Sequence, residues 1–195
     1  MAKALDASKP LLKQLRYLLI FVALLWGLEL IDTLFFQQRL NLLGIRPRSI
    51  DGLKGILFAP LLHGGFAHLA TNTLPFLVLG FFVMLRGLSS FIQVTATIWL
   101  IGGIGIWLTG GSNTLHIGAS IIIFGYLGYL LARAYFERSM VTLMIALFVG
   151  LLYGGMMLGV LPIRAGVSWQ GHLFGFVGGV LAARWGREPS RLARA

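Results

Sequence analysis

Six long apolar stretches recur along the chain, separated by short polar or glycine-rich breaks. They cover residues 17–36, 66–85, 91–110, 117–136, 140–161 and 168–185. Each is close to the roughly 20 residues that an α-helix needs to cross the hydrocarbon core of a bilayer. No alternation typical of β-strands recurs, so a helical bundle is the remaining way to satisfy the backbone in lipid. The pattern predicts an all-α polytopic membrane protein with six transmembrane helices.

The breaks predict one membrane domain flanked by two short tails. We expect an N-tail over 1–16, a membrane domain over 17–185 and a C-tail over 186–195. The longest break, an outer loop over 37–62, is too polar to span but has leucines that suit a loop or short helix in the interface. No small-residue cleavage pattern follows the basic N-terminus, so we expect a retained first helix and not a signal peptide.

Composition and charge agree with a membrane location. The chain is 57% hydrophobic and 11% charged, whereas soluble domains carry about 25% charged residues. The net charge of +10 is concentrated at both ends and between the apolar stretches, which favours lipid headgroups over nucleic acid as the partner. With the N-terminus inside, eleven of the 16 Lys and Arg residues lie on the inner side, so both termini are expected in the cytoplasm. The short, cysteine-free chain suggests a bacterial inner membrane.

Polar residues that are unusual in apolar stretches lie near the starts of the second, fourth and sixth ones. The second stretch has His63, His68 and Asn72 near its start, the fourth has Ser120 and the sixth has His172. In the predicted topology these three helices run in the same direction, so the five side chains share one depth near the outer face. An ionisable residue inside a membrane is a functional hypothesis by default.

Ser120 and His172 are candidates for a nucleophile and its base. A serine hydroxyl reacts well only when a base removes its proton, and the first turn of a helix adds free N–H groups and a positive dipole end. His172 shares a helix face with Gly175 and Gly179, a small-residue ridge that lets a partner helix come close. The alternatives are a helix cap for the serine and an interfacial position for the histidine.

His68 and Asn72 are four residues apart, so they share one helix face. Both are uncharged donors that suit stabilisation of an oxyanion, although a polar clamp between helices would use the same pair. His63 is expected to brace the junction between loop and helix, and His116 to lie at the membrane interface. The histidine spacing and the lack of a nearby carboxylate predict no metal site, no cofactor and a dyad in place of a triad.

These motifs together resemble the rhomboid family of intramembrane serine proteases. The matching residues are His63-x4-His68-x3-Asn72, Gly118-Ala119-Ser120 and His172-x2-Gly175-x3-Gly179, in the family's order, within residues 55 to 183. The resemblance implies a six-helix rhomboid-like bundle with Ser120 as nucleophile and His172 as base. It also implies an oxyanion site of His68, Asn72 and the Ser120 N–H beside Gly118, with Phe124 against the base.

The chain departs from the family pattern in two places. Ile121 follows the serine where the family often has glycine, and the Trp-Arg pair common in the first loop is replaced near Lys54 and Gly55. The resemblance implies a serine endopeptidase that cleaves transmembrane protein substrates near the outer membrane face. One alternative is a catalytically weak or inactive rhomboid-like protein that binds transmembrane clients. A small proton-relaying transporter is disfavoured because paired carboxylates and an inverted repeat are missing.

Overall fold

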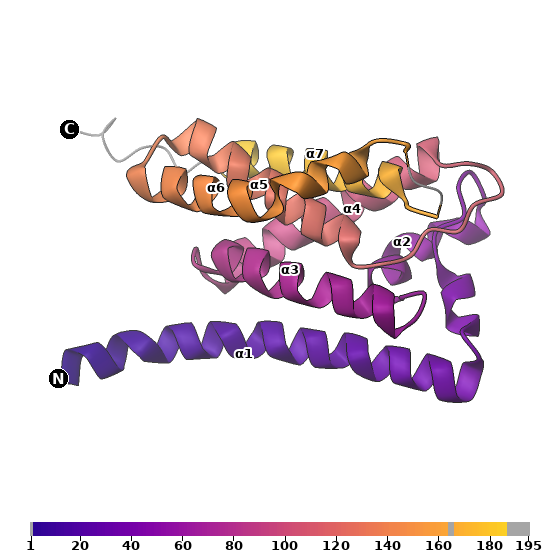
Figure 1. Ribbon diagram of the computed structural model, residues 1–195, viewed down its shortest axis with the longest axis horizontal. Helices are drawn as coiled ribbons and strands as arrows, with labels where there is room; N and C mark the ends of the chain where they lie inside the picture. The colour runs from indigo at the N-terminus through magenta and orange to yellow at the C-terminus, as the bar shows by residue number, and fades with distance from the viewer. Residues whose placement is uncertain (1, 164–165, 187–195) are drawn as a thin grey trace.

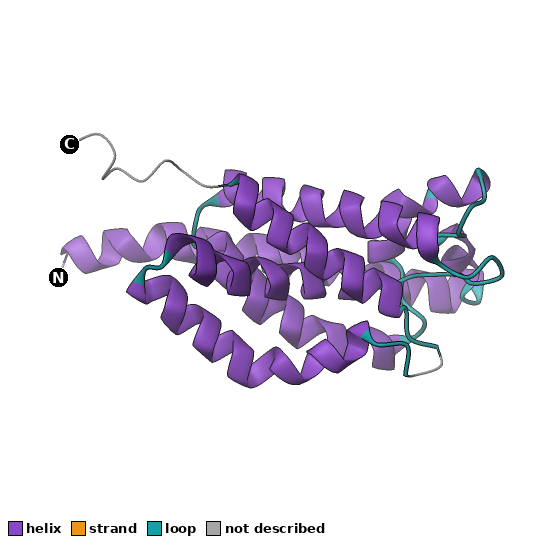
Figure 2. Cartoon of the chain, turned by 90° about the horizontal axis from the view of Figure 1, so that it is seen from above, coloured by secondary structure: helices purple, strands orange, loops and turns teal. Residues whose placement is uncertain are grey.

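The computed structural model describes residues 2–163 and 166–186, and its backbone is helical with connecting loops (Figures 1 and 2). The long helices are α1 (Ala2–Ile31), α3 (Phe66–Met84), α4 (Leu88–Thr109), α5 (Ser120–Glu137), α6 (Met140–Tyr153) and α7 (Trp169–Trp185). A short α2 (Gly55–Phe58), a π-helical turn after α1 and four 3-10 segments complete the described elements. The prediction of an all-helical protein is confirmed.

Four helical segments are long and apolar enough to cross a membrane. They are Gln14–Phe36, Phe66–Met84, Leu88–Thr109 and Met140–Val160. The other two long helices, α5 with 18 residues and α7 with 17, are not among them. Charged and tyrosine side chains lower the hydropathy of α5, and four glycines with polar side chains lower that of α7. A membrane protein with several spans is therefore confirmed, while six crossings stay a prediction.

Helices α5 and α7 pack against each other at the centre of the bundle through glycines. A methyl group added to Gly179 would overlap the carbonyl of Gly125, and one added to Gly175 would overlap the carbonyl of Ile121. On the α5 side, Gly128 faces the carbonyl of Phe176 in the same way. The glycine ridge expected on α7 therefore contacts the helix that carries Ser120. This close packing brings the starts of α5 and α7 together.

Ile121, which replaces the family's glycine, packs against glycines of α4 and α7. Its side chain is 2% exposed and fills a notch between α4 and α7 formed by Gly102 and Gly171. A methyl group on Gly102 would overlap the isoleucine side chain. The extra volume of isoleucine is thus accommodated by glycines on two neighbouring helices.

Replacing Ile121 by alanine is expected to lower the free energy of unfolding by about 2–4 kcal/mol, because the notch would become a cavity. Thermal or denaturant unfolding of the purified protein in detergent measures this change. Ile104→Ala, on the exposed face of α4, is the matched control and should change stability by about 0.5 kcal/mol or less. Equal effects of the two variants would show that Ile121 does not fill the notch.

The outer loop between α1 and α3 is anchored by two tryptophans of α4. Trp99 Nε1 donates a hydrogen bond to the Ile56 carbonyl at 2.6 Å, and Trp107 Nε1 donates to the Ser49 carbonyl at 2.9 Å. The loop itself folds into short helical turns and α2. Indole donors from the neighbouring helix therefore hold the loop that lacks the family's Trp-Arg pair.

Candidate active site

A cavity of about 1090 Å³ lies at the end of the bundle where α3, α5 and α7 begin. Six of the residues singled out in the sequence line it, namely His68, Asn72, His116, Ser120, Phe124 and His172. The other two, His63 and Gly118, do not line the cavity but contact residues beside it. The structure thus gathers side chains from three helices that are far apart in the sequence.

Ser120 is the first residue of α5 and follows a tight turn at Gly118. The φ angle of Gly118 is +117°, a conformation that favours glycine. Its N–H donates to the Ala59 carbonyl at 2.8 Å, and the next N–H, of Ala119, donates to His63 Nε2 at 3.3 Å. No described residue accepts a hydrogen bond from the Ser120 N–H, which lies in the first turn of the helix. That N–H is therefore available to a ligand in the cavity.

His172 is held in one tautomer by a backbone carbonyl. Its Nδ1 lies 2.9 Å from the carbonyl oxygen of Gly159. Because a carbonyl can only accept, Nδ1 carries the proton and Nε2 keeps its lone pair. The Phe124 ring stacks on the imidazole with centroids 3.9 Å apart and planes 5° apart. Stacking and hydrogen bond together fix the ring with an unprotonated Nε2.

His68 is oriented in the opposite sense, as a donor through Nε2. The Gly64 N–H donates to His68 Nδ1 at 3.3 Å, so the proton of a neutral imidazole resides on Nε2. A methyl group added to Gly118 would lie 3.0 Å from that Nε2 and 3.7 Å from Ser120 Oγ. The Nε2–H group and the Ser120 hydroxyl therefore lie on the same side of Gly118, next to the space that a side chain would occupy there.

Asn72 supplies a second uncharged donor from the same face of α3. Its side chain is buried, and its Nδ2 has no hydrogen-bond partner among the described residues. A buried donor without a partner is costly, so an oxygen atom bound in the cavity that Asn72 lines would supply the partner that this amide lacks. Such groups are typical of sites that stabilise developing negative charge.

His63 braces the turn that precedes Ser120, as expected from its place near the loop. The side chain is 1% exposed, and its ring lies edge-on to His68 with centroids 5.2 Å apart. Burial, with a smaller contribution from the nearby His68, lowers the pKa of His63 to about 4. His63 is therefore neutral near pH 7 and keeps Nε2 as an acceptor for the Ala119 N–H.

Ser120 and His172 line the same cavity but share no hydrogen bond in the part of the chain that the structure describes. The partner of His172 Nδ1 is a carbonyl and not a carboxylate. The buried carboxylate Glu29 instead accepts from Gln38 Nε2 at 2.9 Å.

Within residues 2–163 and 166–186, no group of three or more His, Asp or Glu side chains could hold a metal ion.

The sequence did not reveal a second serine–histidine contact in the same cavity. His116 Nδ1 lies 2.6 Å from Ser168 Oγ, and His116 Nε2 lies 2.7 Å from Thr114 Oγ1. His116 is 6% exposed, so its ring is held by protein contacts, while its expected position at the membrane interface stays a prediction. His116 precedes Ser120 by four residues, and Ser168 precedes His172 by four residues. The backbone carbonyl of Ser168 accepts a hydrogen bond from the His172 N–H at 3.1 Å. This contact ties the segment that leads into α5 to the start of α7.

Comparisons with known proteins agree with the resemblance. A model of the Rhomboid domain matches residues 51–188. "Uncharacterized protein Rv1337" of Mycobacterium tuberculosis is 52% identical over 186 residues, which are 91% of this chain and 77% of that protein. "Uncharacterized protein ML1171" of Mycobacterium leprae is 48% identical over the same length, with 91% and 73% covered. "Putative rhomboid protease YdcA" of Bacillus subtilis is 32% identical over 129 residues, with 62% and 61% covered.

The family match includes each of the three motifs, from His63 in the first to Gly179 in the last. It covers more than half of the 195 residues. The same region holds the cavity and the glycine contact between α5 and α7. The chain therefore belongs to the rhomboid family of membrane proteins.

Proposed function

We propose that the protein is an intramembrane serine endopeptidase that cleaves transmembrane protein substrates near the outer membrane face. The observation that carries the proposal is the opposite orientation of two histidines in one cavity. His172 offers an unprotonated Nε2, while His68 offers an Nε2–H beside Ser120. A serine protease needs one base and separate donors for the oxyanion, and the family assignment supports the same chemistry.

In the proposed reaction, Ser120 Oγ attacks the carbonyl carbon of the scissile peptide bond. His172 Nε2 takes the serine proton and returns it to the leaving amine. The oxyanion accepts hydrogen bonds from the Ser120 N–H, His68 Nε2–H and Asn72 Nδ2. Water then hydrolyses the acyl-enzyme with His172 again as base. The hydrogen bond between Ser120 and His172 forms when substrate binds, since catalytic contacts are often long in free enzymes.

The proposed topology has six crossings with both termini in the cytoplasm. A helix of 17 residues, such as α7, is about 26 Å long, slightly less than the roughly 30 Å hydrocarbon core. Because α5 and α7 lie at the centre of the bundle, they need not match the full lipid thickness. In Figure 1, α3, α5 and α7 begin at the same end of the bundle.

The test is cleavage of a transmembrane substrate by the purified protein in liposomes, compared with the Ser120→Ala variant. The proposal predicts cleavage by the wild type and none by the variant. Cleavage that persists in Ser120→Ala would refute the assignment of the nucleophile. If the wild type binds transmembrane segments but cleaves none of a substrate panel, the inactive client-binding alternative is correct.

The contact between His116 and Ser168 is expected to position the proposed dyad. Ser168→Ala removes one hydrogen bond, worth about 1 kcal/mol, and should lower kcat about 5-fold with little change in KM. Ser168→Thr keeps the hydroxyl and should restore most of the rate. Thr114→Val, which removes the bond on the other imidazole nitrogen, is the matched control and leaves the contact with Ser168 in place. Complete loss of cleavage in Ser168→Ala would instead indicate that Ser168 is the nucleophile.

A further inference from the structure

A second, smaller cavity of about 330 Å³ lies at the opposite end of the bundle from the proposed active site. It forms where α3 ends and α4 begins, and where α5 and α7 end. Its polar lining residues are Arg86, Ser90, Gln93, Thr97 and Tyr129, and Trp185 lies at the side of α7. None of these residues takes part in the proposed reaction.

We propose that this cavity binds the phosphate group of an anionic glycerophospholipid. The first support is a polar stripe on α4 that the fold leaves open. Ser90, Gln93 and Thr97 all line the cavity, on a helix that is otherwise apolar enough to cross a membrane. The Thr97 hydroxyl donates to the Gln93 carbonyl at 2.8 Å. The side chains of Ser90 and Gln93 have no hydrogen-bond partner among the described residues, so their donors are free for a ligand.

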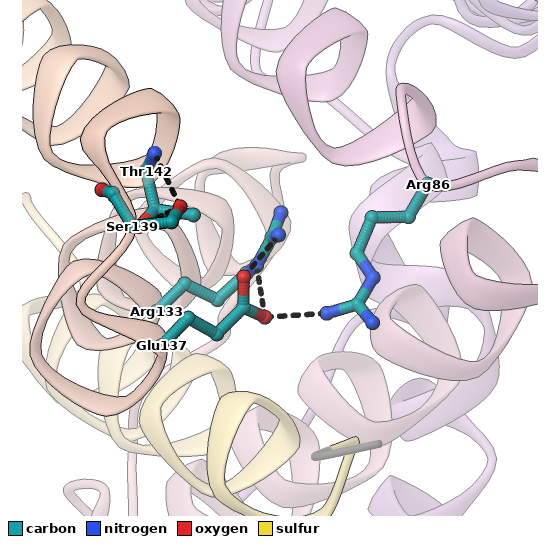
Figure 3. Close-up of polar contacts among 5 residues, drawn as sticks. All are labelled: Arg86, Arg133, Glu137, Ser139 and Thr142. Atoms are coloured by element: carbon teal, nitrogen blue, oxygen red, sulfur yellow. Dashed lines mark hydrogen bonds and ion pairs between the residues drawn. The ribbon is translucent and has the colours of Figure 1, made fainter. Parts of the chain in front are cut away.

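The second support is the charge around Arg86 (Figure 3). Glu137 Oε1 lies 2.6 Å from Arg86 NH1, and the same carboxylate is held by Arg133 through Nε at 2.8 Å and NH2 at 2.6 Å. The Glu137 carboxylate thus pairs with the guanidinium groups of Arg86 and Arg133, so these three side chains together carry a net charge of +1. Only one N–H of Arg86 is used in this ion pair, although a guanidinium has five. Arg86 also shares a hydrogen bond with the Tyr129 side chain in the same lining, and its other donors can bind phosphate oxygens, which guanidinium groups recognise well.

The third support is the set of exposed apolar side chains on the helix ends that form the cavity. Leu85 and Ile92, neighbours of Arg86 and Gln93 in the sequence, are 45% and 56% exposed. Trp185, at the edge of the cavity, is 64% exposed and of the type that lies at membrane surfaces. A phospholipid can place its phosphate in the cavity and its acyl chains against these apolar side chains, which a free phosphate compound cannot do. Basic cavities between transmembrane helices are typical sites for anionic headgroups.

The test is thermal unfolding of the full-length protein in neutral detergent with added short-chain lipids. Dihexanoyl-phosphatidylglycerol should raise Tm by several degrees in a saturable way, because a ligand that binds only the folded state stabilises it. Dihexanoyl-phosphatidylcholine, with the same chains but no net charge, should have little effect at equal concentration. An equal rise with glycerol 3-phosphate or inorganic phosphate would overturn the assignment to a lipid. Equal rises with both lipids would overturn the assignment to an anionic lipid, because phosphatidylcholine carries a phosphate as well.

Variants of the lining residues locate the site. Arg86→Gln should weaken phosphatidylglycerol binding about 10-fold, the effect of losing a charge-assisted contact. Gln93→Ala keeps all three charged residues and should weaken it about 3-fold, so the test stands even if Arg86→Gln fails to fold. Arg184→Gln is the matched control, since it removes the same charge from the exposed last turn of α7 outside the lining. The site is ruled out if Arg184→Gln weakens binding as much as Arg86→Gln, or if Gln93→Ala has no effect.

Discussion

Replacing His172 by alanine is expected to lower the rate of substrate cleavage by roughly 10⁴-fold, with little change in KM. The reason is that Ser120 would lose the group that removes its proton, and a serine hydroxyl alone is a weak nucleophile. The rate of product formation from a reconstituted transmembrane substrate measures this effect. An unchanged Tm of the variant would show that the fold is retained.

Added imidazole provides the control for the role of His172. In His172→Ala the missing ring leaves space beside Phe124, on which the native imidazole stacks. Free imidazole in this space should restore part of the rate, and the restored rate should rise with the unprotonated fraction of imidazole. A loss of rate that imidazole does not relieve, together with a lower Tm, would indicate a structural role for His172 in place of a catalytic one.

Replacing Asn72 by alanine is expected to lower kcat about 10²–10³-fold, as removal of one oxyanion donor does in other serine proteases. The buried Nδ2 has no partner among the described residues, so its donor is available when the oxyanion forms. Because this contact strengthens only in the transition state, KM should change little. Steady-state kinetics of cleavage in detergent or liposomes separates the two constants.

Thr73→Ala is a matched control for Asn72→Ala on the same helix. The Thr73 hydroxyl donates to the Leu69 carbonyl and accepts from Trp26 Nε1, and Thr73 does not line the cavity. Its removal should change kcat less than about 3-fold. A rise in KM with unchanged kcat in Asn72→Ala would mean that Asn72 binds substrate and does not stabilise the oxyanion.

Much of the fold could be predicted because apolar length and glycine spacing are local properties of the sequence. The apolar stretches correspond to the observed helices to within a few residues, with two exceptions: α1 begins at Ala2, and α6 ends at Tyr153 and continues as a 3-10 segment to Val160. The ridge at Gly175 and Gly179 predicted a close partner helix, and α5 is that helix. The hydropathy pattern could not distinguish helices that face lipid from α5 and α7, which lie at the centre.

The candidate site was predicted as far as it depends on one helix at a time. The spacing of His68 and Asn72 placed both on one face of α3, and both line the cavity. The tautomers could not be predicted, because they depend on the carbonyl of Gly159 and the N–H of Gly64. The contact of His116 with Ser168 joins residues 52 positions apart and follows no periodicity.

Two serine–histidine pairs therefore compete as explanations of the cavity. Ser168 already shares a hydrogen bond with His116, whereas Ser120 has beside it the Nε2–H group of His68 and an unused backbone N–H. The histidine donor beside the cavity favours Ser120, since stabilisation of the developing charge is usually the larger effect in such a reaction. The proposed function assigns Ser120 for this reason.

Labelling with a fluorophosphonate, followed by peptide mapping, tests the central claim most directly. The reagent forms a stable adduct with an activated serine and requires no knowledge of the natural substrate. The account predicts one adduct on Ser120, formed much more slowly in His172→Ala and about 5-fold more slowly in Ser168→Ala. An adduct on Ser168, or no adduct on the folded wild-type protein, would contradict it.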